Sequence, residues 1–343
     1  MNSILITGAA GLIGSHLVAY YLSKGWFVVG VDNLIGGYRD NLPIHDNFKF
    51  RKIDILDNTN LKSIMQLYKP TTVIHCAALA HEGLSVFSPK VITENIYAGT
   101  ISVASAAIAA GVQLFINTSS MARYGAITPP FYESDYAVPR DPYGLAKLHA
   151  EEQLNLLSDI HDFTVFHVVP HNVAGPHQCY SDPFRNVLSI FTNQIINDKS
   201  LYIYGNGLQK RSFSHVSDCV AAFATIVEKS KSLKNKSVYN IGPSEGSEIS
   251  INELVTRIER ATNKTATVKY VPDRPREVKD AWVNTDKAED ELGYITTKSL
   301  EDTISDTVNW IISSDRKPFN YHLELEIIND STPKTWTDKL FNG

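Results

Sequence analysis

Cysteine is scarce in this chain, and the three that occur, Cys76, Cys179 and Cys219, lie far apart. An odd and widely spaced set argues against a disulfide framework and offers no metal-ligand spacing. It is the cysteine usage expected of a protein in the reducing cytoplasm. The eleven histidines are scattered without a ligand-like repeat. The sequence therefore predicts no metal site.

Excess positive charge and long apolar runs are also lacking. The chain has 32 Lys and Arg against 37 Asp and Glu, a net charge of −5, and no basic cluster. Nucleic acid is therefore not an expected partner. No apolar stretch approaches the length of a membrane span, and the opening MNSILITG has neither a basic region nor a cleavage-site pattern. We expect no membrane segment and no signal peptide.

The first 170 residues show a regular alternation of short apolar runs and helical patterns. This order predicts βαβ units, and hence an α/β fold with a Rossmann-type, doubly wound parallel sheet. The strand-like runs are 3–7, 27–31, 48–52, 72–76, 114–118 and 164–169, and the helical patterns lie near 12–23, 60–68, 90–110 and 142–158.

Beyond residue 170 the pattern becomes irregular. Helical patterns return near 184–197, 217–229, 250–261 and 299–314. We expect a nucleotide-binding domain over 1–170, with some later segments returning to it, and a smaller α/β substrate-binding domain over 171–316. The tail, 317–343, has mixed polarity, and the sequence assigns it no role.

Three glycines, Gly8, Gly11 and Gly14, join the first strand to the first helix in TGAAGLIGSHL. Glycine allows a tight turn and lets the backbone approach a diphosphate, which then lies at the positive end of the helix. The second strand pattern runs on to Asp32, eighteen residues beyond Gly14. A carboxylate there accepts hydrogen bonds from an adenosine ribose and repels a 2′-phosphate. Although Asp32 could simply begin a turn with Asn33, the combination favours NAD over NADP.

The segment DPYGLAK, 141–147, predicts a helix start with two functional side chains on one face. Asp141 suits the N-cap and Pro142 suits the first helical position. Tyr143 and Lys147 then lie one turn apart. Ionising a free tyrosine at pH 7 costs roughly 4 kcal/mol, and a nearby ammonium and a positive nicotinamide ring reduce that cost. The pair would make a general base for a sugar or alcohol hydroxyl, although the same spacing is common by chance.

Three consecutive hydroxyls, Thr118, Ser119 and Ser120, follow the apolar run VQLFI in the stretch NTSSMARYG. Hydroxyls at the end of a strand are often turn residues. They can also be donors that point at a ligand, and the glycine loop and the Tyr143–Lys147 pair favour that interpretation.

Together these segments resemble the extended short-chain dehydrogenase/reductase family, closest to nucleotide-sugar 4-epimerases of the UDP-glucose/UDP-N-acetylglucosamine type. The resemblance runs from residue 1 to about 315. It also rests on HCAALA (75–80), HNVAGP (171–176), GNGLQKRSFSHVSD (205–218) and RPREV (274–278).

The resemblance implies a role for each matching residue. Ser120 would bond the 4-oxygen of the sugar and pass its proton towards Tyr143, and Lys147 would hold the nicotinamide ribose. The implied catalytic residues are Ser120, Tyr143 and Lys147. The implied NAD-binding residues are Gly8, Gly11, Leu12, Ile13, Gly14, Asp32, Asn33, Asp54, Ile55, Ala77, Asn95, Thr118, Tyr143 and Lys147. The implied substrate-binding residues are Ser120, Asn172, Asn186, Arg211, Arg274 and Ala281, with the two arginines on the diphosphate.

One position departs from the family spacing. Asn95 resembles the family's cofactor-proximal Asn, but NIYAGT is one residue longer than usual before its Gly-Thr.

The residues beside Ser120 bear on which reaction the resemblance implies. Dehydratases of this family carry an Asp-Glu pair there and uronate decarboxylases carry a Glu, whereas this chain has Met121 and Ala122. A 3,5-epimerase would need a cysteine near 122. The implied reaction is inversion at C4 through a transient 4-keto sugar. An NAD(P)-dependent nucleotide-sugar dehydrogenase or reductase, a dehydratase, and a non-catalytic dinucleotide sensor remain alternatives.

The substrate and the assembly are further expectations. A small residue at Ala281 leaves room for a 2-N-acetyl group, which favours UDP-GlcNAc/UDP-GalNAc, with or without UDP-Glc/UDP-Gal, unless Ala281 is only a packing residue. Uronates are less expected, because Asn172 and Cys179 stand where their epimerases tend to carry Thr and Arg. The helices near 92–110 and 142–158 match those that pair between subunits of the family, so we expect a homodimer.

Overall fold

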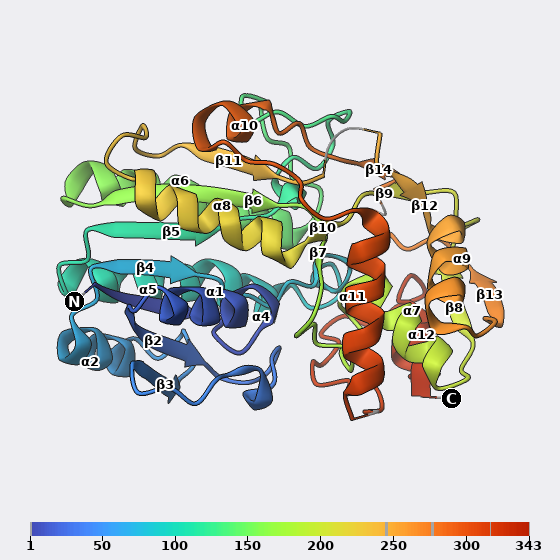
Figure 1. Ribbon diagram of the computed structural model, residues 1–343. Helices are drawn as coiled ribbons and strands as arrows, with labels where there is room; N and C mark the ends of the chain where they lie inside the picture. The colour runs from blue at the N-terminus through green and yellow to red at the C-terminus, as the bar shows by residue number, and fades with distance from the viewer. Residues whose placement is uncertain (1, 244–245, 276–277, 316, 343) are drawn as a thin grey trace.

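The computed structural model describes residues 2–243, 246–275, 278–315 and 317–342. Its central element is a seven-stranded parallel sheet in the order β11-β6-β5-β4-β1-β2-β3 (Figure 1). The strands are β1 (Ser3–Thr7), β2 (Phe27–Asp32), β3 (Phe48–Lys52), β4 (Thr72–His75), β5 (Leu114–Thr118), β6 (Thr164–Pro170) and β11 (Val238–Ile241). The predicted doubly wound fold is confirmed, and β11, which the sequence pattern did not indicate, extends the sheet beyond β6.

Side chains of the strands alternate between two helical layers. Ile4 and Ile6 of β1 pack on one face, against α1 (Leu12–Ser23) and α8 (Val216–Lys229). Leu5 packs on the other face, against α2 (Asn58–Tyr68), α5 (Gly99–Ala109) and α6 (Pro142–Ile160). Because both faces of a parallel sheet are buried, its strands are almost entirely apolar.

Most of the remaining elements form a second unit at the carboxyl ends of the strands, on the right in Figure 1. Its core consists of apolar residues from α7 (Val187–Ile196), β8 (Leu201–Tyr204), α9 (Ile251–Thr262) and α11 (Leu300–Ser313). The helix α10 (Asp286–Leu292) instead packs with α8 and β11 in the sheet unit. The other short elements are α3 (Glu82–Ser85), β7 (Val173–Ala174), β9 (Lys210–Arg211), β10 (Ser214–His215), β12 (Ile249–Ser250), β13 (Val268–Val271), β14 (Asp280–Ala281) and α12 (Lys334–Thr337).

The C-terminal tail is a built part of this second unit. Trp336 and Phe341 are buried in the same core cluster as α7, α9 and α11. Earlier in the tail, the Glu324 carbonyl accepts a hydrogen bond from Ser88 Oγ at 2.7 Å. The carboxylate of Glu326 accepts the Lys90 and Val91 amides at 2.8 Å each. The tail therefore joins the second unit to the segment that follows β4.

The sequence led us to expect no apolar stretch of membrane-spanning length, but one helix of the structure has that length. Residues Pro89–Ala109 form a continuous helix of 21 residues, and its length and composition suffice for a span. It consists of α4 (Pro89–Thr93), a π-helical turn η2 (Glu94–Ala98) and α5. It packs beside α2 and α6, and Val103, Ala104 and Ala107 are buried against the sheet.

Candidate active site

A cavity of about 430 Å³ lies where the strands end and the second unit begins. Such a crevice at the carboxyl ends of parallel strands is where open α/β sheets bind ligands. The predicted site residues that line it are Gly8, Gly11, Leu12, Ile13, Gly14, Asp32, Asn33, Ile55, Ala77, Asn95, Thr118, Ser120, Tyr143, Lys147, Asn172, Asn186, Arg211 and Arg274. Asp54 and Ala281 are not among the described lining residues.

The glycine loop forms the end of the cavity nearest α1. Gly8 has φ +67°, and a Cβ there would lie 2.7 Å from the Ala77 amide nitrogen. A Cβ on Gly14 would overlap the Gly8 carbonyl. Side chains at either position would therefore break the turn. Gly11 is the N-cap of α1, so the unpaired amides of the first turn lie at the cavity, where they suit an anion.

Asp32 lies at the end of β2, one strand from the glycine loop. Its carboxylate accepts the Ala10 amide at 2.9 Å and the Leu34 amide at 2.7 Å. Burial raises the pKa of Asp32, and these two hydrogen bonds oppose the rise. Asn33 donates to Asp54 at 2.8 Å, so Asp54 holds Asn33 from behind the cavity wall.

The predicted catalytic residues converge on one side of the cavity. Asp141 caps α6 by accepting the Gly144 amide at 2.8 Å, which places Tyr143 and Lys147 in the first turns of the helix. The Lys147 ammonium donates to the Thr118 carbonyl at 2.7 Å and lies 5.9 Å from the centre of the Tyr143 ring. Burial raises the pKa of Tyr143 to about 12, and its hydrogen bond with Ser120 opposes that rise. Burial also lowers the pKa of Lys147 to about 8.

The three consecutive hydroxyls at the end of β5 have different partners. Ser120 meets Tyr143 and also accepts the Ala122 amide at 3.2 Å. Thr118 donates to the Cys76 sulfur at 3.4 Å. Ser119 donates to the buried carboxylate of Glu151. Of the three, Ser120 is thus the one bonded to the expected base, and Ser119 supports the packing beneath it.

Asn95 faces the cavity despite its unusual spacing. It lies within the π-helical turn η2, and its side-chain oxygen accepts the Leu79 amide at 2.8 Å. A π-turn accommodates one extra residue in a helix. The turn therefore absorbs the additional residue of NIYAGT and keeps Asn95 against the loop that follows β4.

The expected substrate residues lie on the second-unit side. Asn172 donates to the Ser212 carbonyl at 3.0 Å, and Asn186 caps α7 by accepting the Leu188 amide at 2.9 Å. The Arg211 guanidinium donates to the Lys210 carbonyl in β9 and to the Val278 and Lys279 carbonyls just before β14. Arg274 lies over the Tyr204 ring, 4.6 Å from its centre. Of the segment RPREV, residues 276–277 lie outside the described residues.

Among the expected substrate residues, Ala281 is the one that does not line the cavity. Pairing of β14 with β9 puts it in register with Arg211. Its methyl group is fully buried in a cluster with Tyr124, Phe131 and Val283. The expectation that Ala281 borders the sugar therefore loses its support, and its small size is explained by packing.

The cavity residues that were not predicted from the sequence include Glu82, Arg185, Trp336 and Phe341. Trp336 and Phe341 come from the tail, whose sequence has no periodic signal. Arg185 stands next to the predicted Asn186 in the sequence, and its side chain forms an ion pair with Asp182 at 3.2 Å.

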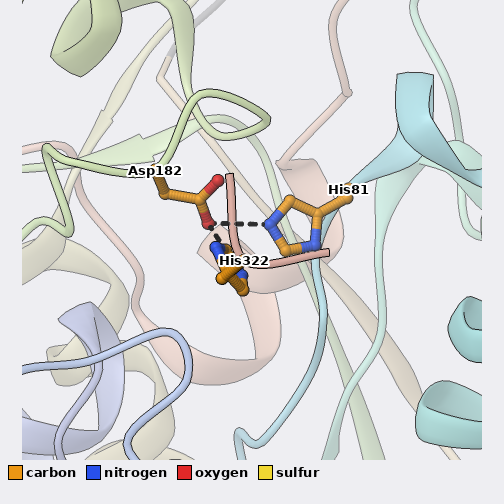
Figure 2. A group of neighbouring side chains, drawn as sticks. All are labelled: His81, Asp182 and His322. Carbon is orange, nitrogen blue, oxygen red and sulfur yellow. Dashed lines mark hydrogen bonds and ion pairs between the residues drawn. The ribbon is translucent and has the colours of Figure 1, made fainter. Parts of the chain in front are cut away.

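Asp182 is the centre of a buried group that the scattered histidines did not suggest. Figure 2 shows His81, Asp182 and His322, which come from the loop after β4, the segment before α7 and the tail. Their potential metal-ligand atoms lie within 4.8 Å of one another. His81 and Arg185 both approach the same Asp182 oxygen, at 2.8 and 3.2 Å. With a guanidinium on that oxygen, the group is best described as a hydrogen-bonded ion-pair cluster.

The cavity residues fit a dinucleotide. The glycine turn leaves no room for side chains, the amides of α1 suit a diphosphate, and Asp32 and Lys147 stand where two riboses need polar partners.

Residues 4–242 match the model of the NAD dependent epimerase/dehydratase family. The chain belongs to this family. It is an NAD-dependent enzyme of the epimerase type.

Relatives and solved structures agree with this assignment. The chain is 33% identical to a UDP-glucose 4-epimerase of Mycolicibacterium smegmatis, over 89% of this chain and 97% of that protein. It is 32% identical to a UDP-glucuronate 4-epimerase of Thermodesulfobacterium geofontis, over 90% and 96%. The structure of a UDP-N-acetylglucosamine 4-epimerase from Methanobrevibacter ruminantium M1, in complex with UDP-N-acetylmuramic acid, superposes with a TM-score of 0.82 at 29% identity, over 91% of this chain and 98% of that chain.

Proposed function

We propose that this enzyme inverts C4 of a UDP-linked hexose. The observation that carries the proposal is the contact of Ser120 with Tyr143 inside a cavity that also holds the glycine loop. Beside Ser120 stand Met121 and Ala122. Neither can transfer the second proton that elimination of water requires. The arrangement therefore favours redox chemistry at one carbon and disfavours a dehydratase.

The acid–base work falls to Tyr143. Its phenol oxygen takes the proton of the sugar's 4-hydroxyl. The Ser120 hydroxyl would bond both the phenol oxygen and the 4-oxygen. Lys147 provides a buried positive charge near the ring and is fixed by the Thr118 carbonyl. Bound NAD supplies the acceptor for the hydride of C4. After the 4-keto sugar has turned over, the hydride returns to the other face of C4 and Tyr143 gives the proton back to the 4-oxygen, which completes the inversion.

Inversion requires a firmly held nucleotide and a hexose that can turn over. Arg211 and Arg274 stand at the second-unit end of the cavity, where guanidinium groups suit a diphosphate. Tyr202, Tyr204 and Trp336 form an aromatic wall near them, suited to stacking with a base. The side chains next to Ser120 are uncharged, which leaves the hexose free to rotate.

For the sugar, we propose the UDP-Glc/UDP-Gal and UDP-GlcNAc/UDP-GalNAc pairs. Support comes from the activities named for the relatives and not from Ala281, which is buried elsewhere. We also propose that the enzyme acts in the cytoplasm, in keeping with its three free cysteines.

The test is a panel of UDP-, GDP-, CDP- and dTDP-sugars, UDP-glucuronate included, incubated with the pure enzyme and resolved by NMR. We expect C4 epimers of the neutral UDP-hexoses without net NADH. Net NADH would indicate a dehydrogenase, a 4-keto-6-deoxy product a dehydratase, and conversion of UDP-glucuronate alone a uronate epimerase. Any of these three results contradicts the proposal.

A further inference from the structure

Arg185 is held in the cavity by a chain of buried groups. Its Nε donates to Asp182 at 3.2 Å, and that carboxylate also accepts His81 Nε2 at 2.8 Å and the Phe184 amide at 2.9 Å. The side chains of His81 and Asp182 are 0% and 1% exposed. Burial opposes a charge on Asp182, but its cationic and hydrogen-bonding neighbours outweigh burial and hold its pKa well below the usual value. Asp182 therefore stays ionised and fixes the guanidinium.

The tail closes this group from the far side. His322 Nε2 lies 3.9 Å from the same Asp182 oxygen, too far for a hydrogen bond. His322 Nδ1 is 3.1 Å from the Asn320 carbonyl, so Nδ1 is the donor and Nε2 is left unprotonated in the neutral ring. The His322 ring thus lies beside the ion pair of Asp182 and Arg185.

The other end of Arg185 lies on the cofactor side of the cavity. A Cβ added to Gly36 would overlap Arg185 Nη2. The loop of Gly36 is fastened to the glycine turn, because the Tyr38 amide and the Asn41 side chain both donate to the Ala10 carbonyl, at 3.2 and 2.8 Å. The guanidinium therefore lies beside the turn that receives the dinucleotide.

The positive charge of Arg185 acts on two groups, Asp32 and Tyr143, that lie where the two ends of a dinucleotide would bind. Burial raises the pKa values of Asp32 and Tyr143, and the Arg185 guanidinium opposes the rise at both. Asp32 marks the adenosine ribose and Tyr143 marks the nicotinamide end. The diphosphate of a dinucleotide spans the distance between them.

The cavity receives two diphosphates, one from NAD and one from the proposed UDP-sugar. Arg211 and Arg274 lie at the end formed by the second unit, where Arg274 contacts Tyr204. Arg185 is separate from them and contacts Gly36.

We propose that Arg185 binds the diphosphate of the dinucleotide, and that Asp182 and His81 are its positioning residues. The glycine turn alone supplies neutral amides. A guanidinium adds a charged fork, which suits an enzyme that must keep its cofactor through each turnover. The inference rests on NAD as the cofactor and does not depend on which sugar is converted.

The test compares ligands that do and do not carry the relevant diphosphate. Protein stripped of nucleotide is titrated by calorimetry with ADP-ribose, adenosine and UDP. For Arg185→Gln we expect ADP-ribose to bind at least tenfold more weakly, with adenosine and UDP unchanged within twofold. Arg185→Lys should recover part of the loss. Arg39→Gln, an exposed cation in the same loop that lies over the Phe50 ring, should change none of the three.

Two further variants separate charge from fold. Gly36→Ala keeps every charge but displaces the guanidinium, so it should weaken ADP-ribose binding in the wild type and add little in the Arg185→Gln background. It also answers the question if Arg185→Gln does not fold. Asp182→Asn should weaken ADP-ribose binding and leave adenosine unaffected, a difference that a general loss of structure would not produce. Unchanged ADP-ribose affinity in Arg185→Gln, or a loss confined to UDP, would overturn the proposal.

Discussion

Tyr143 and Lys147 show how burial governs acid–base groups at the scale of single residues. The sequence suggests that the ammonium favours the phenolate, yet burial has the larger effect and raises the pKa of Tyr143 to about 12. The same burial lowers the pKa of Lys147 to about 8. The tyrosine is therefore protonated at neutral pH in the structure as it stands. A positive nicotinamide ring in the same cavity would favour its ionisation.

Removing the phenol oxygen tests the assignment of the base. In Tyr143→Phe we expect turnover to fall at least about 100-fold, the low end for one general acid–base group, with the fold and the NAD content retained. Tyr124→Phe is the matched control, because its buried oxygen donates to Asn240 at 2.8 Å outside the cavity lining. A Tyr143→Phe enzyme of near-normal turnover would show that another group is the base.

Lys147 also gives stability a pH dependence. Its pKa falls from 10.5 in the unfolded chain to about 8 in the folded protein, so between these values the unfolded state binds more protons. The free energy of unfolding should then rise with pH in this window. The full effect is on the order of 3 kcal/mol. Urea titrations of wild type and Lys147→Met between pH 7.5 and 10.5 should show this rise in the wild type alone, and parallel profiles would contradict it.

At the scale of elements, the first half of the fold could be predicted because its signals are local. The predicted strands and helices up to residue 170 agree with the structure within a few residues. The start of α6 follows from Asp141 and Pro142 directly. β11 has only four residues and no alternation, and its place is set by pairing with β6.

Site residues follow the same division. The glycine loop and the Tyr143–Lys147 face depend on spacing within one segment. Arg185 depends on Asp182, His81 and the tail, which the chain brings together from distant positions. Ala281 resembled a cavity residue, but the pairing of β14 with β9 directs it into a core cluster. Both the contacts of Arg185 and the pairing of β14 with β9 join segments far apart in the sequence, so local sequence patterns do not predict them.

The π-turn η2 makes a prediction at this scale. Asn95 holds the Leu79 amide, and Ala77 to Ala80 line the cavity. In Asn95→Ala we expect faster hydrogen exchange at Leu79 and weaker retention of NAD, because the loop after β4 loses its anchor. Asn60→Ala, which removes an exposed amide on α2, is the control. Unchanged exchange at Leu79 would mean that the loop is held by other contacts.

For the molecule as a whole, the tail is the part to which the sequence assigned no role. Trp336 is 4% exposed and packs against Phe184 and Phe87. The tail thus contributes both to the core of the second unit and to the wall of the cavity.

Truncating one tail side chain should therefore affect stability and binding together. Trp336→Ala is expected to lower the free energy of unfolding by about 3–5 kcal/mol, the usual cost of emptying a large aromatic site, and to weaken UDP binding. Urea denaturation and calorimetry measure the two effects. Tyr136→Ala, at a side chain 88% exposed, is the control. A stability loss near zero would place Trp336 outside the cooperative core.

Assembly is the last property at this scale, and α6 presents the surface for it. Leu145, Leu156 and Ile160 are 44, 63 and 74% exposed. Their spacing places them along one side of the helix with His149. The helix α5 presents less surface to a partner, since its small residues Ala104, Ala106 and Ala107 are buried inside the subunit. The exposed side of α6 is therefore the stronger candidate for the interface of the homodimer that we expect.

Light scattering at micromolar concentration should give twice the chain mass. Leu156→Glu should give the monomer mass, because an unpaired carboxylate in an apolar contact is costly. Leu67→Glu, at a residue 68% exposed on α2, should leave the dimer intact. A wild type that scatters as a monomer would contradict the expectation. Dimers in both variants would place the interface elsewhere on the surface.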